Sequence, residues 1–213
     1  MDIILESFQH LLDPDWIMKN GGLFLVLLIL FIETGIIIGF FLPGDPLLFV
    51  SGMVIASSSE VHYPFSSSLF NLPFWIMLFM IATIAGNFFG YWFGNRFSHL
   101  INRKEDTWFL KKKHVHTARE FYEKRGGSAI VIARFLPIVR TFAPIIAGTV
   151  KMDFKKFSLF NILGAAIWVG SLTSLGYILG NNVWVKQNLE FIILGIVILV
   201  TAPVIFKLIF KKK

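Results

Sequence analysis

The sequence predicts an all-α integral membrane protein, in which a re-entrant helical hairpin followed by a transmembrane helix occurs twice, in inverted orientation. Hydrophobic residues make up 55% of the 213 positions and charged residues only 15%, against about 25% charged in a typical soluble domain. Long uncharged runs cover residues 64–95, 157–185 and 191–206, and a membrane span needs about 20 largely apolar residues. The length suits one compact membrane domain, residues 1–213.

The first interrupted apolar stretch, residues 22–57, carries two isolated carboxylates. Glu33 and Asp45 are its only charged side chains, and an ionisable group at the centre of a membrane helix costs about 2.5–3.5 kcal/mol on insertion scales. Pro43 and Gly44 interrupt the helical hydrogen bonding between them. Irregular backbone at membrane depth is tolerated where it is buried in protein or lines a wet cavity. The stretch is therefore predicted to form a re-entrant hairpin that carries both candidate functional residues.

Residues 128–150 form a second interrupted apolar stretch. Arg134, Pro137, Arg140 and Pro144 interrupt it, so it is too irregular for a single span and is predicted to be a second re-entrant hairpin. The other predicted elements are an interfacial amphipathic segment at 1–20, a transmembrane helix at 73–96, a basic amphipathic helix at 100–125, and transmembrane helices at 157–180 and 187–207.

Positive charge clusters in two places along the chain. Nine Lys and Arg residues lie between residues 96 and 125, and three lysines end the chain. Such clusters favour the cytoplasmic side of a membrane, so the net charge of +7 does not indicate nucleic-acid binding. The N-terminus is then expected outside and the C-terminus in the cytoplasm, with the two hairpins entering from opposite faces. Two full spans in place of each hairpin would give the same orientation, so that alternative stays open.

Two short motifs recur in the two halves of the chain. The Phe-Leu-Pro at residues 41–43 returns at 135–137, and the Asn-x-x-Gly that begins at Asn87 returns at Asn161. Each half then contains a broken hairpin followed by a span, as in transporters whose binding site lies where broken helices meet. Asn87 and Asn161, polar within predicted spans, are expected to bridge helices by hydrogen bonds, with contact to the substrate as the alternative.

Arg134 and Arg140 are the candidate substrate-binding residues. An arginine stays charged and presents a fork of donors that matches a phosphate group. The two are six positions apart, and a break at Pro137 allows them to converge on one lipid phosphate. The alternative is that they pair with Glu33 and Asp45 and hold the two hairpins together.

The carboxylates are expected to act differently from the arginines. Ionised Glu33 and Asp45 only accept hydrogen bonds, so they would repel a phosphate beside them. Burial favours the neutral carboxyl and a nearby arginine favours the ionised one, which suits a site that exchanges protons or cations. A purely structural role, as helix caps or as partners of the arginines, is the alternative.

Several kinds of chemistry find no support in the sequence. The chain has no cysteine, which excludes disulfides and thiolate metal sites, and it has no Walker loop, Gly-x-Ser-x-Gly elbow or His-Glu-x-x-His motif. His114 and His116 have no acidic partner at metal-ligand spacing. We therefore expect no cofactor, no metal and no enzyme activity. Tryptophan and tyrosine residues are expected to anchor the protein at the membrane interface.

These motifs together resemble the DedA family, also called the SNARE-associated or VTT-domain superfamily. The matching stretches are Glu33 through Gly52, Gly86 through Tyr91, Arg134 through Arg140, Ala147-Gly148, Met152, Phe157, and Asn161 through Trp168. Many relatives carry Glu where this chain has Asp45, which keeps the carboxylate. The resemblance implies a bacterial cytoplasmic-membrane protein needed for envelope integrity, with the acidic and arginine residues required for activity. Some members resemble translocases of undecaprenyl phosphate, and distant eukaryotic relatives are lipid scramblases.

The expected function is therefore a flippase that moves undecaprenyl phosphate from the outer to the inner leaflet, coupled to protons, in support of cell-wall biogenesis. The expected partners are this lipid, the surrounding membrane lipids and protons, with a homodimer as an alternative to a monomer. A proton-coupled antiporter for a small cation or drug and a phospholipid scramblase remain open. A lipid phosphatase is less favoured, because all five histidines, at 10, 62, 99, 114 and 116, lie outside the predicted core.

Overall fold

The computed structural model describes residues 16, 22–37, 39, 42–56, 64–98, 128–134, 137–189, 191–192 and 194–195. In these residues every regular element is an α-helix, which confirms the all-α prediction. The predicted segment at 1–20, apart from residue 16, lies outside them, as do the basic helix at 100–125 and most of the last predicted span at 187–207.

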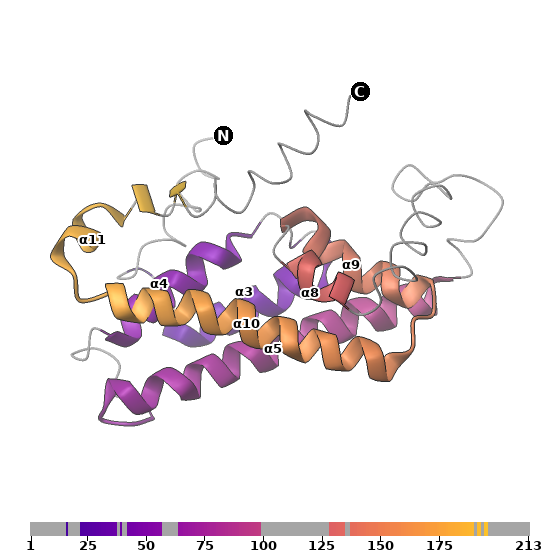
Figure 1. Cartoon of the computed structure of the whole chain (residues 1–213), viewed down its shortest axis with the longest axis horizontal. Coiled ribbons are helices and arrows are strands. Elements are labelled where there is room, and N and C mark those ends of the chain that lie inside the picture. The colour runs from indigo at the N-terminus through magenta and orange to yellow at the C-terminus, as the bar shows by residue number, and fades with distance from the viewer. Residues whose placement is uncertain are drawn as a thin grey trace.

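Two long helices, α5 (Ser68–Arg96) and α10 (Phe154–Leu179), form the scaffold on which the short helices pack. Both are long and apolar enough to cross a membrane, and they contain the predicted spans to within one residue. Asp153 caps α10 by accepting a hydrogen bond from the backbone of Lys156 at 2.9 Å. The two helices lie side by side and run in opposite directions (Figure 1).

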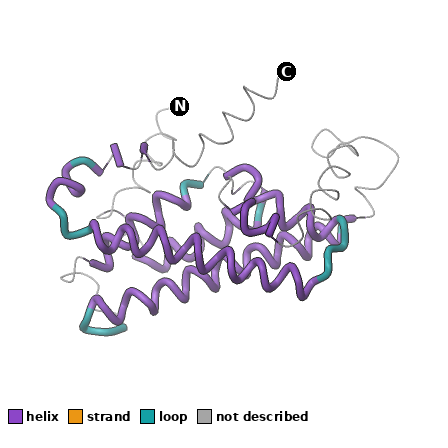
Figure 2. Tube along the Cα trace, viewed as in Figure 1, coloured by secondary structure: helices purple, strands orange, loops and turns teal. Residues whose placement is uncertain are grey.

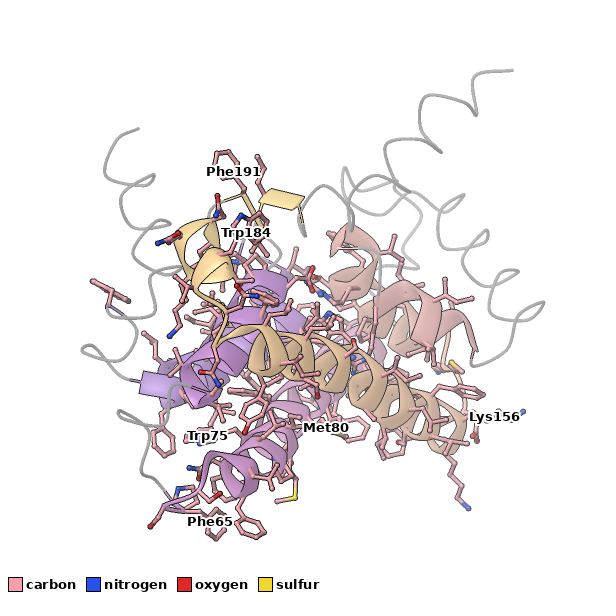
Figure 3. The ribbon with its side chains drawn as sticks, turned by 60° about the vertical axis from the view of Figure 1, so that its left-hand side comes forward. Phe65, Trp75, Met80, Lys156, Trp184 and Phe191 are labelled. Atoms are coloured by element: carbon pink, nitrogen blue, oxygen red, sulfur yellow. The ribbon has the colours of Figure 1, made fainter. Side chains whose placement is uncertain are left out.

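Most of the apolar surface of α5 and α10 faces outward, as expected of helices in contact with lipid. Tryptophans are divided between the surface and the interior. Trp184, on the short helix α11 (Val183–Gln187), is exposed and lies near the top of the view in Figure 3. Trp75 and Trp168 are buried, so the expectation that tryptophans anchor the protein at the membrane interface is wrong for these two.

Both interrupted stretches fold as pairs of short helices. The first contains α3 (Gly22–Gly35) and α4 (Gly44–Ala56), and the second contains α8 (Ser128–Arg134) and α9 (Pro137–Thr149). Their lengths are 14, 13, 7 and 13 residues, against about 20 for a membrane span. The described residues between α3 and α4, which include Pro43, are not α-helical, and α8 ends at Arg134 just before Pro137 begins α9 (Figure 2). Pro144 lies inside α9 and does not interrupt it.

The two arms of each helix pair pack against different long helices. In the first pair α3 lies on α5 and α4 on α10, and in the second α9 lies on α5 and α8 on α10. Glycines allow close contact between several of these helices: a Cβ added at Gly52 would overlap the backbone of Thr173, and one added at Gly148 would overlap that of Tyr91. The short helices therefore meet at the centre of the bundle, where their interrupted ends lie.

Candidate functional site

Arg140 and the two carboxylates form one buried cluster at this centre. The Nη1 of Arg140 donates to Oδ1 of Asp45 at 2.7 Å, and its Nη2 donates to Oε1 of Glu33. All three side chains are buried. For Arg140, this arrangement corresponds to the pairing alternative set out from the sequence, since both carboxylates bind the same guanidinium.

The interruption between α3 and α4 places the two carboxylates in the cluster. Glu33 lies in the last turn of α3, and Asp45 lies in the first turn of α4, where the helix dipole favours negative charge. Pro43 directly precedes α4 and Gly44 begins it. A Cβ added at Gly44 would overlap the carboxylate of Glu33, so a larger residue here would push that carboxylate out of its present place.

Trp168 completes the cluster from α10. Its Nε1 donates to Oδ1 of Asp45 at 2.7 Å, and its ring lies under Arg140, with 4.4 Å from the guanidinium carbon to the ring centroid. Sequence reasoning missed this role, because it treated the tryptophans as interface anchors. The available signal was the spacing of Trp168 from Asn161: seven residues apart, they share one face of a helix.

Arg134, the last residue of α8, has different partners. Its Nη2 donates to the carbonyl oxygen of Asn161 at 3.1 Å and to the side-chain oxygen of the same residue. Its exposure is 1%, and within the described residues neither its Nε nor its Nη1 has a hydrogen-bond partner. Gly164 leaves space for it, because a Cβ there would come within 2.7 Å of Arg134 Cδ. The second Asn-x-x-Gly motif thus accommodates this arginine.

The asparagines of the two motifs meet across the long helices. Nδ2 of Asn87 donates to Oδ1 of Asn161 at 2.8 Å. With the Asn87 amide turned over, its nitrogen donates to the carbonyl oxygen of Thr34 at 3.1 Å and its oxygen accepts from Arg134 Nη2 at 2.8 Å. That orientation satisfies both ends of the amide and places Arg134 between the two asparagines.

The structure therefore brings all four predicted charged residues to one buried region. Arg134 and Arg140 approach the same Trp168 ring, with guanidinium carbons 6.0 and 4.4 Å from its centroid. Pro137 begins α9, between the two arginines. In the described part of the chain, no group of three His, Asp or Glu residues is placed to hold a metal ion.

Comparisons with known proteins match the same region. A model of the VTT domain matches residues 21–178, which include every residue of the cluster. Protein DedA of Escherichia coli K12 is 35% identical over all of this chain and 94% of its own length. Uncharacterized membrane protein ML0287 of Mycobacterium leprae is 34% identical over 95% of this chain and 89% of its own.

Inner membrane protein YqjA of Escherichia coli K12 is 34% identical over 83% of this chain and 75% of its own length. No solved structure matches the chain. Since the matches span the interrupted helix pairs, both long helices and the buried charges, the chain belongs to the DedA family of VTT-domain membrane proteins.

Proposed function

We propose that this protein carries a polyprenyl phosphate, and undecaprenyl phosphate first among them, from the outer to the inner leaflet of a bacterial cytoplasmic membrane, coupled to protons. The observation that carries the proposal is the state of Arg134. It is a buried cation whose Nε and Nη1 nitrogens lack a hydrogen-bond partner within the described residues, and no described carboxylate forms an ion pair with it. A phosphate would supply both the missing charge and the missing acceptors.

The carboxylates provide a route for coupling. While Glu33 and Asp45 are ionised, they occupy Arg140 and repel a second anion. Protonation of either carboxylate weakens its hold on Arg140, because the charge attraction is lost. The freed guanidinium then joins Arg134 in holding the phosphate. Binding of the lipid head and uptake of a proton would thus occur together.

The arrangement of the short helices supports entry of the lipid head from both faces. None of α3, α4, α8 and α9 has the length of a span, which favours re-entrant hairpins. The first pair approaches from one end of the bundle and the second from the other (Figure 1), as expected of an inverted repeat. The tail of the lipid would stay against the apolar outer surface of α5 and α10.

The choice of lipid and membrane comes from the family. The name of YqjA places that relative in the inner membrane, and we extend this location to the present chain. The positive charges of residues 96–125 then favour a cytoplasmic loop. The resemblance of some members to undecaprenyl phosphate translocases makes this lipid the first substrate to test.

A second candidate is proton-coupled antiport of a small cation. The observation in its favour is that two buried carboxylates face a single cationic group, a setting in which an external cation can compete with Arg140. This candidate requires no phosphate at Arg134.

A leaflet-resolved assay separates these functions. Purified full-length protein in liposomes that contain undecaprenyl phosphate should speed its passage between leaflets, and an imposed pH gradient should change the rate. Arg134→Ala should remove this activity, whereas Gly170→Ala, on an open part of α10, serves as a control. Release of inorganic phosphate would indicate a phosphatase. Lipid movement no faster than in protein-free liposomes would refute the proposal, and cation-driven proton flux in the same vesicles would favour the antiporter.

A further inference from the structure

Six of the described helices fall into two groups according to where a glycine brings one backbone close to another. We call α3, α5 and α9 the first group and α4, α8 and α10 the second. A Cβ added at Gly94 would overlap the carbonyl oxygen of Ile145, and one at Gly176 would overlap that of Phe49. Wherever a Cβ added to a described helical glycine would meet the backbone of another helix, both helices belong to the same group. Close-packed backbones of this kind move together, so each group is expected to behave as a unit.

Side chains connect the two groups along a boundary that we call the seam. The side-chain amides of Asn87 and Asn161 lie 2.8 Å apart, and Tyr91 stacks on Phe157 with ring centroids 4.6 Å apart. The arms of each short helix pair belong to different groups, so residues 36–43 link the groups covalently in the first pair. Side chains can repack where interlocked backbones cannot, and the seam is therefore the place where the molecule can open.

The two carboxylates lie on different sides of the seam. Glu33 and Arg140 both belong to the first group, so their pair stays intact when the groups move apart. Asp45 belongs to the second group, and its bond from Arg140, at 2.7 Å, crosses the seam. Opening the seam therefore breaks the Asp45–Arg140 pair.

Trp168 contacts both members of that pair. It lies in the second group with Asp45, to which its Nε1 donates at 2.7 Å, and its ring supports Arg140 from across the seam at 4.4 Å. We propose that Trp168 is a positioning residue that holds Asp45 against Arg140 and so keeps the seam closed. Asp45 is the carboxylate that releases Arg140 during transport, and Glu33 is the one that stays with it. The proposal takes transport from the proposed function, but it does not depend on which substrate is moved.

A single engineered thiol can report opening of the seam. The chain has no cysteine of its own. Ala165 is fully buried, and its spacing from Asn161 and Trp168 puts all three on one face of α10. In full-length Ala165→Cys protein in lipid nanodiscs, a water-soluble maleimide should react slowly, because the seam is closed for most of the time.

Trp168→Phe keeps a ring beneath Arg140 and removes the N–H donor. Since a hydrogen bond to a charged group changes an equilibrium by about tenfold or more, labelling of the Ala165→Cys thiol should become about tenfold faster. Trp75→Phe is the matched control, because Trp75 has the same exposure of 2% and packs among phenylalanine rings. Its labelling rate should stay within about twofold of the parent protein. Equal rates for the two variants would overturn the proposal.

Asp45→Ala removes the acceptor of the same Trp168–Asp45 hydrogen bond. This variant should also label faster, and adding Trp168→Phe to it should have little further effect, because the acceptor has already been removed. An undiminished effect of Trp168→Phe in the Asp45→Ala background would show that Trp168 acts by packing alone and would refute the proposal. So would labelling of Asp45→Ala at the parental rate, a result that remains decisive if Trp168→Phe does not fold. Failure of lipid transport in the liposome assay, with these labelling rates as expected, would reject the proposed function and leave the role of Trp168 standing.

Discussion

Arg140 and Asp45 are 95 residues apart in the chain, yet Nη1 of Arg140 donates to Oδ1 of Asp45 at 2.7 Å in the buried centre of the molecule. The same guanidinium also binds Glu33, 107 residues away. One side chain of α9 thereby joins both arms of the first helix pair to the second pair. Removing one residue from such a cluster leaves a buried charge without its opposite charge.

Arg140→Met should therefore lower the free energy of unfolding by about 3–5 kcal/mol, the usual cost of breaking a buried ion pair from one side. Arg140→Lys should cost less, because an ammonium still faces the carboxylates. Adding Glu33→Gln and Asp45→Asn to Arg140→Met should recover part of the loss, since no unpaired charge remains. Unfolding of the purified variants in a denaturing-detergent titration gives these values, and an unchanged stability of Arg140→Met would contradict the expectation.

Arg134→Lys tests recognition of phosphate. Lysine keeps the charge but loses the planar fork, and a charge-assisted hydrogen bond contributes about 1.5–3 kcal/mol. Binding of undecaprenyl phosphate should weaken severalfold or more, with a small change in melting temperature. Both quantities are measured on the same purified samples, with Arg140→Lys beside them. Unchanged binding together with a lowered melting temperature would assign Arg134 to the scaffold.

Glu33→Gln and Asp45→Asn test proton exchange, because each amide keeps the size and polarity of its carboxyl group but cannot ionise. Each variant should abolish transport while expression stays close to that of the parent protein. Transport is compared in liposomes between about pH 6 and pH 8. If both variants transport normally over this range, the carboxylates are not proton sites.

Cysteine accessibility tests the inverted arrangement. Cysteines placed at Pro43 and Pro137, in this thiol-free chain, should be labelled from opposite sides of the membrane. Two exposed positions serve as references: Ser66, beside Phe65, and Lys156, and Figure 3 shows Phe65 and Lys156 at opposite ends of the structure. Ser66→Cys should react from outside intact cells, and Lys156→Cys only after permeabilisation. Labelling of positions 43 and 137 from the same side would exclude an inverted repeat.

Two glycines of α10 differ in what surrounds them and test the close packing of α4 on α10. Gly176→Ala would place a methyl group on the backbone of Phe49 and should cost about 1–3 kcal/mol of stability, as overpacking does. Gly170 has no neighbour within 4 Å of an added Cβ, and Gly170→Ala should be neutral or stabilise by up to about 1 kcal/mol through helix propensity. Equal melting temperatures for the two variants would show that α4 and α10 are not closely packed.

Much of the helical framework could be read from the residues alone. Apolar length predicts α5 and α10, and the proline residues predict the interruptions that divide α3 from α4 and α8 from α9. Isolated charges in apolar surroundings pointed to Glu33, Asp45, Arg134 and Arg140, all of which are buried. These features are local: helix formation, helix breaking and the cost of a buried charge depend on a residue and its near neighbours in the chain.

The pairing of these charged residues with one another could not be predicted from the sequence in the same way. The two arginines look alike in the sequence, but Arg140 binds two carboxylates whereas Arg134 binds Asn161. The role of Trp168 was missed for the same reason, since its partners come from α4 and α9. Local chemistry was enough to predict that two broken helix pairs carry buried charges of both signs. Which of these charges meet depends on the packing of the helices, because the arms of each pair lie on different long helices, and the direction of each buried side chain follows from that packing.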